Sequence, residues 1–175
     1  MRKRVFLSLV SALALALSAA STTTAVSTHR QVQVLDDCDP ASFDAALDNP
    51  NACVKSGGTT FDAFIRQLIA TGQAPAWRFA PTRLELASGG SIDAYNRGGE
   101  FHTFTEVANF GGGCVDILNQ ILGLTAVPEC TNAGILFATT GIAPGGELEG
   151  AALSSGTHLF ECLIHPWMRS TVVVQ

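Results

Sequence analysis

The chain has 175 residues, of which 10 are Lys or Arg and 15 are Asp or Glu, so its formal net charge at pH 7 is −5. An acidic chain does not suit nucleic acid, whose phosphates attract basic surfaces. The length allows one domain with a substantial hydrophobic core and is too short for two domains of ordinary size.

The first twenty residues have the layout of a secretory signal peptide. The basic start MRKR is followed by the apolar run VFLSLVSALALAL and then by the small residues SAAS. The apolar run is shorter than the roughly 20 residues that a membrane-spanning helix needs. We therefore predict cleavage near Ala20, a secreted (periplasmic or extracellular) protein, and no membrane span once the signal peptide, residues 1–20, is removed.

Residues 21–75 are predicted to be a polar leader followed by a helical extension. The segment DPASFDAAL begins with Asp39, a residue type that caps helices, and with Pro40 at the first helical position. In TTFDAFIRQLIATG the apolar residues recur at helical spacing between Thr60 and Gly72, a helix terminator. These helices are expected to pack on a larger unit.

From Ala76 the apolar period changes from 3.6 to 2, which predicts short strands separated by Gly and Pro turns. An insertion over residues 109–130 carries one predicted helix, Val115 to Leu122. The strands predict an antiparallel β-sandwich over residues 76–175. The segments assigned to strands are AWRFAP, RLELAS, SIDAYN, EFHTFTEV, GILFAT, ELEGAAL, THLFEC and STVVV.

The five cysteines of an exported chain cannot all pair with one another. Cys38 and Cys53 bracket one short segment, and Cys114 and Cys130 bracket another. Each predicted disulfide closes a loop of about 15 residues, for which the chain-entropy model gives roughly 3 kcal/mol. Cys162 is then the unpaired thiol.

Cys162 lies in HLFECLIHPWMRSTVVV, close to two residues that bind soft metals. Alternation along a strand places His158 and Cys162 on one face, but two strand steps apart, so His158 is interpreted as a hydrogen-bonded core residue. His165 precedes a proline and is held extended. A tight turn can therefore bring His165 and Met168 back around the thiolate.

A second imidazole, His102, is supplied by GGEFHTFTEV. Two imidazoles, a thiolate and a weak axial thioether form the trigonal set of a blue-copper electron-transfer centre. The predicted metal ligands are therefore His102, Cys162, His165 and Met168. They are expected to hold one copper ion that alternates between Cu(I) and Cu(II).

The segments PTRLELASGGSIDAYNRGGEFHTF and GTHLFECLIHPWMRSTVVV resemble the two halves of a cupredoxin, the family of small blue copper proteins that includes plastocyanin, azurin and amicyanin. The ligand loop C-x2-H-x2-M, with HPWM in place, is similar in length to that of amicyanin. The resemblance covers residues 76–175 and implies a mainly β, Greek-key β-sandwich, to which the N-terminal helical extension and a disulfide-pinned helical insertion are additions. The chain departs from the family at Thr103, where an Asn commonly braces the ligand loop.

The resemblance also implies a function: an electron carrier, not an enzyme, that shuttles single electrons between protein partners. In the family, an apolar patch around the second imidazole is the docking face through which electrons enter. The corresponding patch here is Leu163, Ile164, Pro166 and Trp167. Glu106 and Glu161 flank ligands in sequence and are predicted to be surface charges.

Three other functions are compatible with the same residues. The ligand set suits copper storage, delivery or sensing in the cell envelope, with redox activity incidental. A copper oxidoreductase needs an open coordination position or a second metal, and no paired His-x-His motif is present. A structural zinc ion accepts Cys and His, but thioether is a poor ligand for it.

Overall fold

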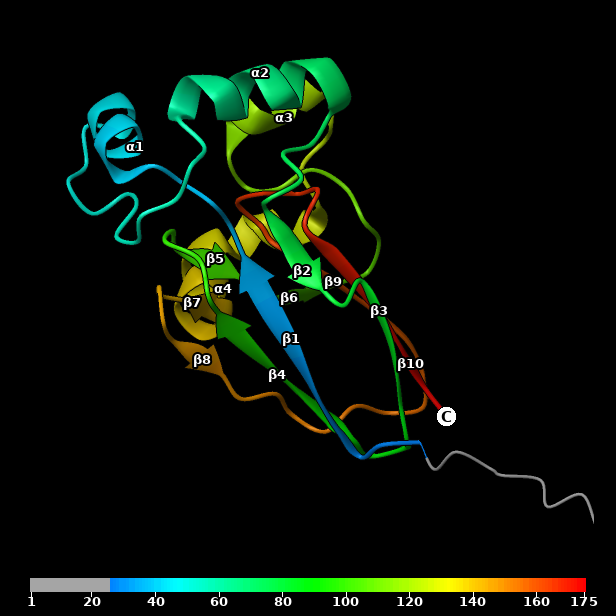
Figure 1. Cartoon of the computed structure of the whole chain (residues 1–175). Helices are drawn as coiled ribbons and strands as arrows, with labels where there is room; N and C mark the ends of the chain where they lie inside the picture. The colour runs from blue at the N-terminus through cyan, green and yellow to red at the C-terminus, as the bar shows by residue number, and fades with distance from the viewer. Residues whose placement is uncertain (1–25) are drawn as a thin grey trace, which may run out of the picture.

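The computed structural model describes residues 26–175, so the predicted signal peptide lies outside the described residues. The described residues form two four-stranded sheets and one short pair of strands (Figure 1). The first sheet has the order β2 (Arg78–Ala80), β1 (His29–Leu35), β4 (Ser91–Asn96), β8 (Glu147–Leu148). The second has the order β3 (Arg83–Leu86), β10 (Arg169–Val174), β9 (Gly156–Glu161), β6 (Thr105–Val107). The short pair is β5 (His102–Thr103) with β7 (Gly141–Ile142).

The two sheets share one hydrophobic core, so the predicted mainly β sandwich is confirmed. Burial alternates along β4 and β10, as expected when one face of a strand packs inward. Val32 of β1 and Leu84 of β3 are buried in the same cluster, although they belong to different sheets. The two rings of Phe79 and Phe104 also meet in this core, with their centroids 5.1 Å apart.

The sandwich differs from the prediction in strand direction and in where it begins. β1 runs parallel to β4 and β10 runs parallel to β3, so the expectation of a purely antiparallel sandwich was wrong for these two pairs. Both pairs join strands far apart in sequence, which leaves chain enough for the crossover that parallel pairing requires. Residues 29–35, expected to lie in the polar leader, form β1 in the middle of the first sheet.

The helices of the N-terminal extension form as the capping residues predict. α1 spans Pro40–Leu47, and the Asp39 side chain accepts a hydrogen bond from the backbone N–H of Ser42 at 2.9 Å. α2 spans Phe61–Thr71 and begins at Thr60, whose hydroxyl accepts from Ala63. It ends at Gly72, whose φ of 73° suits glycine.

The insertion and the segment that follows it are more helical than expected. α3 (Asp116–Leu122) agrees with the predicted helix, and a 3-10 helix, η1 (Pro128–Asn132), and α4 (Ala133–Thr140) follow it. The prediction of a strand for GILFAT, residues 134–139, was therefore wrong. A short apolar run without a clear period does not distinguish a strand from a helix, and here η1 leads directly into α4.

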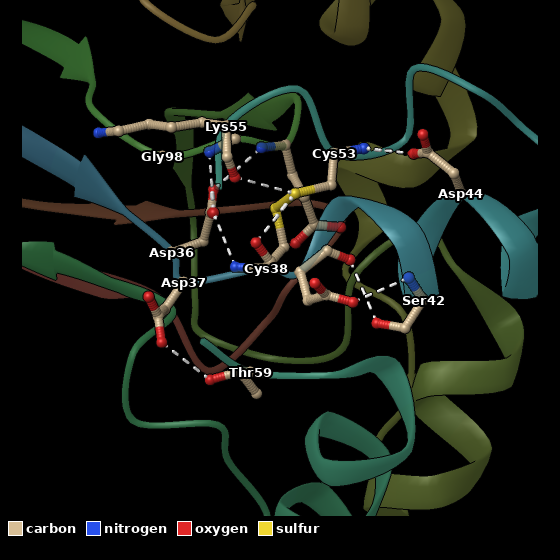
Figure 2. The surroundings of a disulfide bond; sticks show 12 residues. Asp36, Asp37, Cys38, Ser42, Asp44, Cys53, Lys55, Thr59 and Gly98 are labelled. Atoms are coloured by element: carbon tan, nitrogen blue, oxygen red, sulfur yellow. Dashed lines mark hydrogen bonds between the residues drawn. A yellow bond between two sulfur atoms is a disulfide. The ribbon is translucent and has the colours of Figure 1, made fainter. Parts of the chain in front are cut away.

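The predicted disulfides, Cys38–Cys53 and Cys114–Cys130, are both present, and Cys162 is a buried free cysteine. Figure 2 shows the first disulfide, with Asp36 beside it and Asp44 bonded to the backbone N–H of Cys53. This disulfide ties the end of β1 to the segment that follows α1.

Helices α2 and α3 lie together over the end of the sandwich that carries the loop between β9 and β10 (Figure 1). Phe64 of α2 packs against this loop, with its ring centroid 5.8 Å from that of Trp167. Within residues 26–175, none of the helices is long and apolar enough to cross a bilayer.

Candidate metal centre

Three of the four predicted ligands converge at this end of the sandwich. His102 comes from β5, Cys162 follows the last residue of β9, and His165 lies in the loop to β10. The Nδ1 atoms of the two histidines are 3.2 Å apart, and Cys162 Sγ lies 3.8 Å from Nδ1 of His102 and 3.9 Å from Nδ1 of His165. All three side chains are buried.

The separations between the three donor atoms fit a trigonal metal ion. Metal–nitrogen bonds of about 2.0 Å and a metal–thiolate bond of about 2.3 Å at 120° place the two nitrogens about 3.5 Å apart and each nitrogen about 3.7 Å from the sulfur. The corresponding distances in the chain are 3.2, 3.8 and 3.9 Å. A thiolate and two imidazoles are also ligand types that copper favours. The residues therefore fit a copper ion in both geometry and chemistry.

Met168, the fourth predicted ligand, is fully buried immediately before β10. The backbone of Met168 makes two hydrogen bonds within the ligand loop. The N–H of Cys162 donates to the carbonyl of Met168 at 3.1 Å, and the N–H of Met168 donates to the carbonyl of His165 at 2.9 Å. These bonds hold the loop in a tight turn that keeps the His165 imidazole near the Cys162 sulfur.

Thr103 braces the ligand loop, although cupredoxins commonly have Asn at this position. Its hydroxyl accepts a hydrogen bond from the backbone N–H of Leu163 at 2.8 Å, which fastens the ligand loop to β5. The N–H of Thr103 donates to Cys162 Sγ at 3.4 Å. A hydrogen bond to the sulfur stabilises its negative charge and is one of the interactions that set the redox potential of a thiolate-bound metal.

The insertion also supports the ligand loop. A side chain at Gly113 would place its Cβ 2.3 Å from the carbonyl oxygen of Leu163, so only glycine allows this close approach. The N–H of Cys114 donates to the same carbonyl. One half-cystine of the Cys114–Cys130 disulfide therefore contacts the loop that carries His165 directly.

Asp36 is the functional residue that sequence reasoning missed. Its Oδ2 lies 2.8 Å from Nε2 of His102, and because a carboxylate only accepts, the imidazole donates here, so that Nδ1 is the nitrogen that faces the sulfur. The carboxylate also accepts from the backbone N–H groups of Gly99 and Glu100. No periodic signal connects Asp36 with His102, which lies 66 residues further along the chain.

The charged forms of Asp36, His102 and Cys162 stabilise one another. Burial alone would raise the pKa of Asp36, but the hydrogen bond and charge of His102 outweigh it and hold this pKa at about 2. Burial would lower the pKa of His102, but Asp36 and Cys162 outweigh it and raise this pKa to about 9. Burial would raise the pKa of the Cys162 thiol, but both imidazoles hold it well below its ordinary value. These shifts favour the thiolate form of Cys162, which is the form that binds metals.

His165 is covered by the helical extension and is only 4 % exposed. Its imidazole packs edge-on against Phe64 of α2, with ring centroids 6.2 Å apart. Its Nε2 lies 3.9 Å from the carboxylate of Glu100, which accepts a hydrogen bond from the Trp77 indole. In the predicted docking patch, Leu163 and Pro166 are buried, and Ile164 and Trp167 are half-buried.

Glu161 is fully buried, so the prediction of a surface charge was wrong. Residues of the insertion form a second hydrophobic cluster that includes Leu159, and this cluster shields the face of β9 that carries Leu159 and Glu161 from water. Glu161 accepts from the Arg169 guanidinium at 2.9 Å, and burial raises its pKa to about 7. Glu106 is exposed as expected and pairs with His158 at 2.6 Å, so His158 is hydrogen-bonded outside the candidate centre.

No protein-family model and no curated protein matches the sequence. Solved structures similar to the chain are cupredoxins. A purple cupredoxin from Nitrosopumilus maritimus is 14% identical, with 83% of this chain and 99% of that chain covered and a TM-score of 0.41. Plastocyanin from Dryopteris crassirhizoma is also 14% identical, with 83% and 99% covered and a TM-score of 0.39. A Cu(I) form of an amicyanin variant is 19% identical, with 56% and 73% covered and a TM-score of 0.36.

The chain's own sheets and site define its class: a mainly β sandwich of two four-stranded sheets that carries a buried cluster of two histidines and one free cysteine.

Proposed function

We propose that the protein is an exported type 1 copper protein that carries single electrons, with one copper ion held by His102, Cys162, His165 and Met168. The observation that carries this proposal is the buried, unpaired Cys162, whose sulfur lies 3.8 and 3.9 Å from two imidazole nitrogens. A bound copper ion supplies a centre that accepts and releases one electron.

The residues around the centre perform separate tasks. Asp36 fixes the tautomer of His102, so that the nitrogen facing the sulfur is free to bind a metal. Thr103 orients the thiolate of Cys162 and fastens the ligand loop. Because these contacts are made by packed strands, the donor atoms need little rearrangement when an electron arrives or leaves, and this favours fast transfer.

The first experiment is an absorption spectrum and a voltammogram of the protein loaded with Cu(II). We expect an intense blue thiolate-to-copper absorption and a reversible one-electron wave. Cys162→Ala should abolish the colour, and Met168→Leu should keep copper bound while shifting the potential. His158→Ala is the matched control, because this histidine pairs with Glu106 outside the cluster. A colourless protein that binds no copper would overturn the proposal.

Copper storage or delivery is the second candidate, and the burial of His165 favours it. An electron carrier needs an edge of its metal centre within reach of a partner, whereas here α2 covers the imidazole. The two functions differ in the expected rate of electron self-exchange. Fast electron self-exchange between Cu(I) and Cu(II) forms supports the carrier, and slow exchange with tight Cu(I) binding supports storage.

Export and a protein redox partner belong to the same proposal. The two disulfides support an oxidising compartment, where such bonds persist. A partner is proposed to dock at the half-buried Ile164 and Trp167, because they are the more accessible part of the apolar patch. Cell fractionation tests the location. Replacing Trp167 with Ala and measuring reduction by a candidate partner tests the docking face.

A further inference from the structure

A cavity of about 290 Å³ lies between α1, α2, α3 and the ligand loop. Its walls are mainly aromatic and aliphatic, and they include Phe43, Phe61 and Phe64. Leu47 and Ile117 also line it and are 49 % and 59 % exposed, so the cavity opens to solvent between α1 and α3. The helical extension thus covers the ligand loop and also encloses a space beside it.

The polar side chains that line this cavity are Glu100 and His165. Both are buried, at 7 % and 4 % exposure. Glu100 accepts a hydrogen bond from Trp77 through one oxygen, which leaves acceptor capacity on the carboxylate. The cavity therefore has apolar walls and, beside His165, one buried hydrogen-bond acceptor.

We propose that this cavity binds a small phenol, with its ring among the three phenylalanines and its hydroxyl donating to Glu100. A cavity of about 150 Å³ holds benzene, so one of this volume accommodates a substituted ring or two fused rings but no protein segment of useful size. Aromatic walls favour an aromatic ring through edge-to-face and stacked contacts.

The charges near the cavity favour an uncharged ligand that can donate a hydrogen bond. Glu100 would repel a carboxylate ligand, and the copper ion proposed behind His165 would repel an organic cation. This step rests on the proposed function. A phenolic hydroxyl carries no charge at neutral pH and donates one hydrogen bond, so it satisfies both neighbours. The ligand would lie against the side of His165 that faces away from Cys162.

The test uses 4-ethylphenol as the probe and calorimetry on the copper-loaded protein. We expect saturable 1:1 binding. Ethylbenzene, which lacks the hydroxyl, should bind roughly tenfold more weakly, because the hydrogen bond to a charged acceptor is lost. The variant Ile121→Phe fills the cavity from α3 and should lose most of the affinity for 4-ethylphenol. Ile69→Phe is the matched control, because this residue lies on the exposed face of α2.

A second measurement does not depend on a variant that folds: nuclear Overhauser contacts between the phenol ring and Phe64 in the Cu(I) form. Their presence supports the assignment. Absence of saturable binding, or equal binding by the Ile121→Phe variant in its folded form, would overturn it.

Copper uptake is measured first, from the blue absorption, so that failure of the cavity assignment and failure of the proposed function can be distinguished. If the colour forms and the phenol does not bind, only the cavity assignment fails. If the phenol binds to a protein that takes up no copper, the copper function fails and the cavity assignment is supported.

Discussion

At the scale of single residues, Asp36 is the contact that most changes the chemistry of His102. A carboxylate behind a metal-bound imidazole raises the basicity of the ring and so stabilises the more highly charged metal. The side chain of Asp36 is buried and also accepts hydrogen bonds from two backbone N–H groups, so its position is fixed by the fold of the chain.

We expect Asp36→Asn to raise the potential of the proposed copper centre. Losing such a carboxylate typically costs tenfold to hundredfold in metal affinity. If this loss falls on Cu(II), a one-electron couple moves by about 60–120 mV, at 59 mV for each tenfold change. Voltammetry measures the shift. Asp37→Asn is the control, because Asp37 bonds to Thr59 and not to a ligand. Equal potentials in the two variants would contradict the role of Asp36.

Glu161 should make the protein less stable as the pH rises from about 4.5 to 7. Its pKa is raised from 4.5 to about 7 in the folded chain, so the folded state holds the proton over a range in which the unfolded state has released it. Stability therefore falls with rising pH, by about 3 kcal/mol over this window at 1.36 kcal/mol per pKa unit.

The variant Glu161→Gln isolates this contribution, because glutamine keeps an acceptor for Arg169 and does not titrate. Urea unfolding at pH 4.5 and pH 8 should show that the variant gains stability relative to the wild type at the higher pH. The same difference at both pH values would show that the pKa of Glu161 is not raised in the folded state.

At the scale of elements, helix α2 determines how far the ligand loop is open to other molecules. Phe64 packs against His165, Trp167 and Trp77 at once and is 3 % exposed. The helix is fixed in place by its caps and by its apolar face, so the cover over His165 is part of the folded structure.

We expect Phe64→Ala to destabilise the protein by about 3–5 kcal/mol, the usual cost of removing a buried phenylalanine. It should also speed electron self-exchange of the copper-loaded protein, because the His165 edge becomes accessible. Ile69→Ala on the opposite face of α2 should change neither quantity appreciably. If the exchange rate is unchanged in a Phe64→Ala protein that is still folded, then α2 does not limit access.

The sequence predicted those elements whose signal is local. Burial alternates clearly along β3, β4 and β10, and both helices of the extension have caps that can be recognised from the residues alone. The spacing of Cys162, His165 and Met168 indicated the ligand loop for the same reason. β1 was missed although QVQV alternates, because its partners β2 and β4 follow a long helical segment.

What the sequence could not indicate depends on contacts between distant segments. Asp36 and His102 meet only because β1 and β4 pair and bring the loop after β4 beside the end of β1. Glu161 is buried only because the insertion folds over β9. Neither contact leaves a periodic trace in one segment, so pattern reasoning could not find them.

At the scale of the whole molecule, the candidate ligands are held by the fold itself. Hydrogen bonds with Asp36, Thr103 and the loop backbone position them, and the common core of the two sheets includes Cys162 and Met168. We therefore expect removal of copper by a chelator to leave the fold intact, with an unchanged far-UV circular dichroism spectrum.

Copper should nevertheless raise the melting temperature, because a ligand that binds only the folded state stabilises it by about 4 kcal/mol at a thousand times its dissociation constant. Calorimetric melting of the metal-free and copper-loaded forms measures this difference. A metal-free protein that lost its cooperative transition would mean that copper, and not the core, holds the sandwich together.

The 60 residues that separate His102 from Cys162 have a consequence for how the protein matures. A contact this distant in sequence is slow to form, because closing a long loop costs entropy. We therefore expect the donor atoms to meet only after both sheets have assembled. We expect the order of events to be folding first and metallation second, so that a newly made chain presents a finished pocket to whatever delivers its ion.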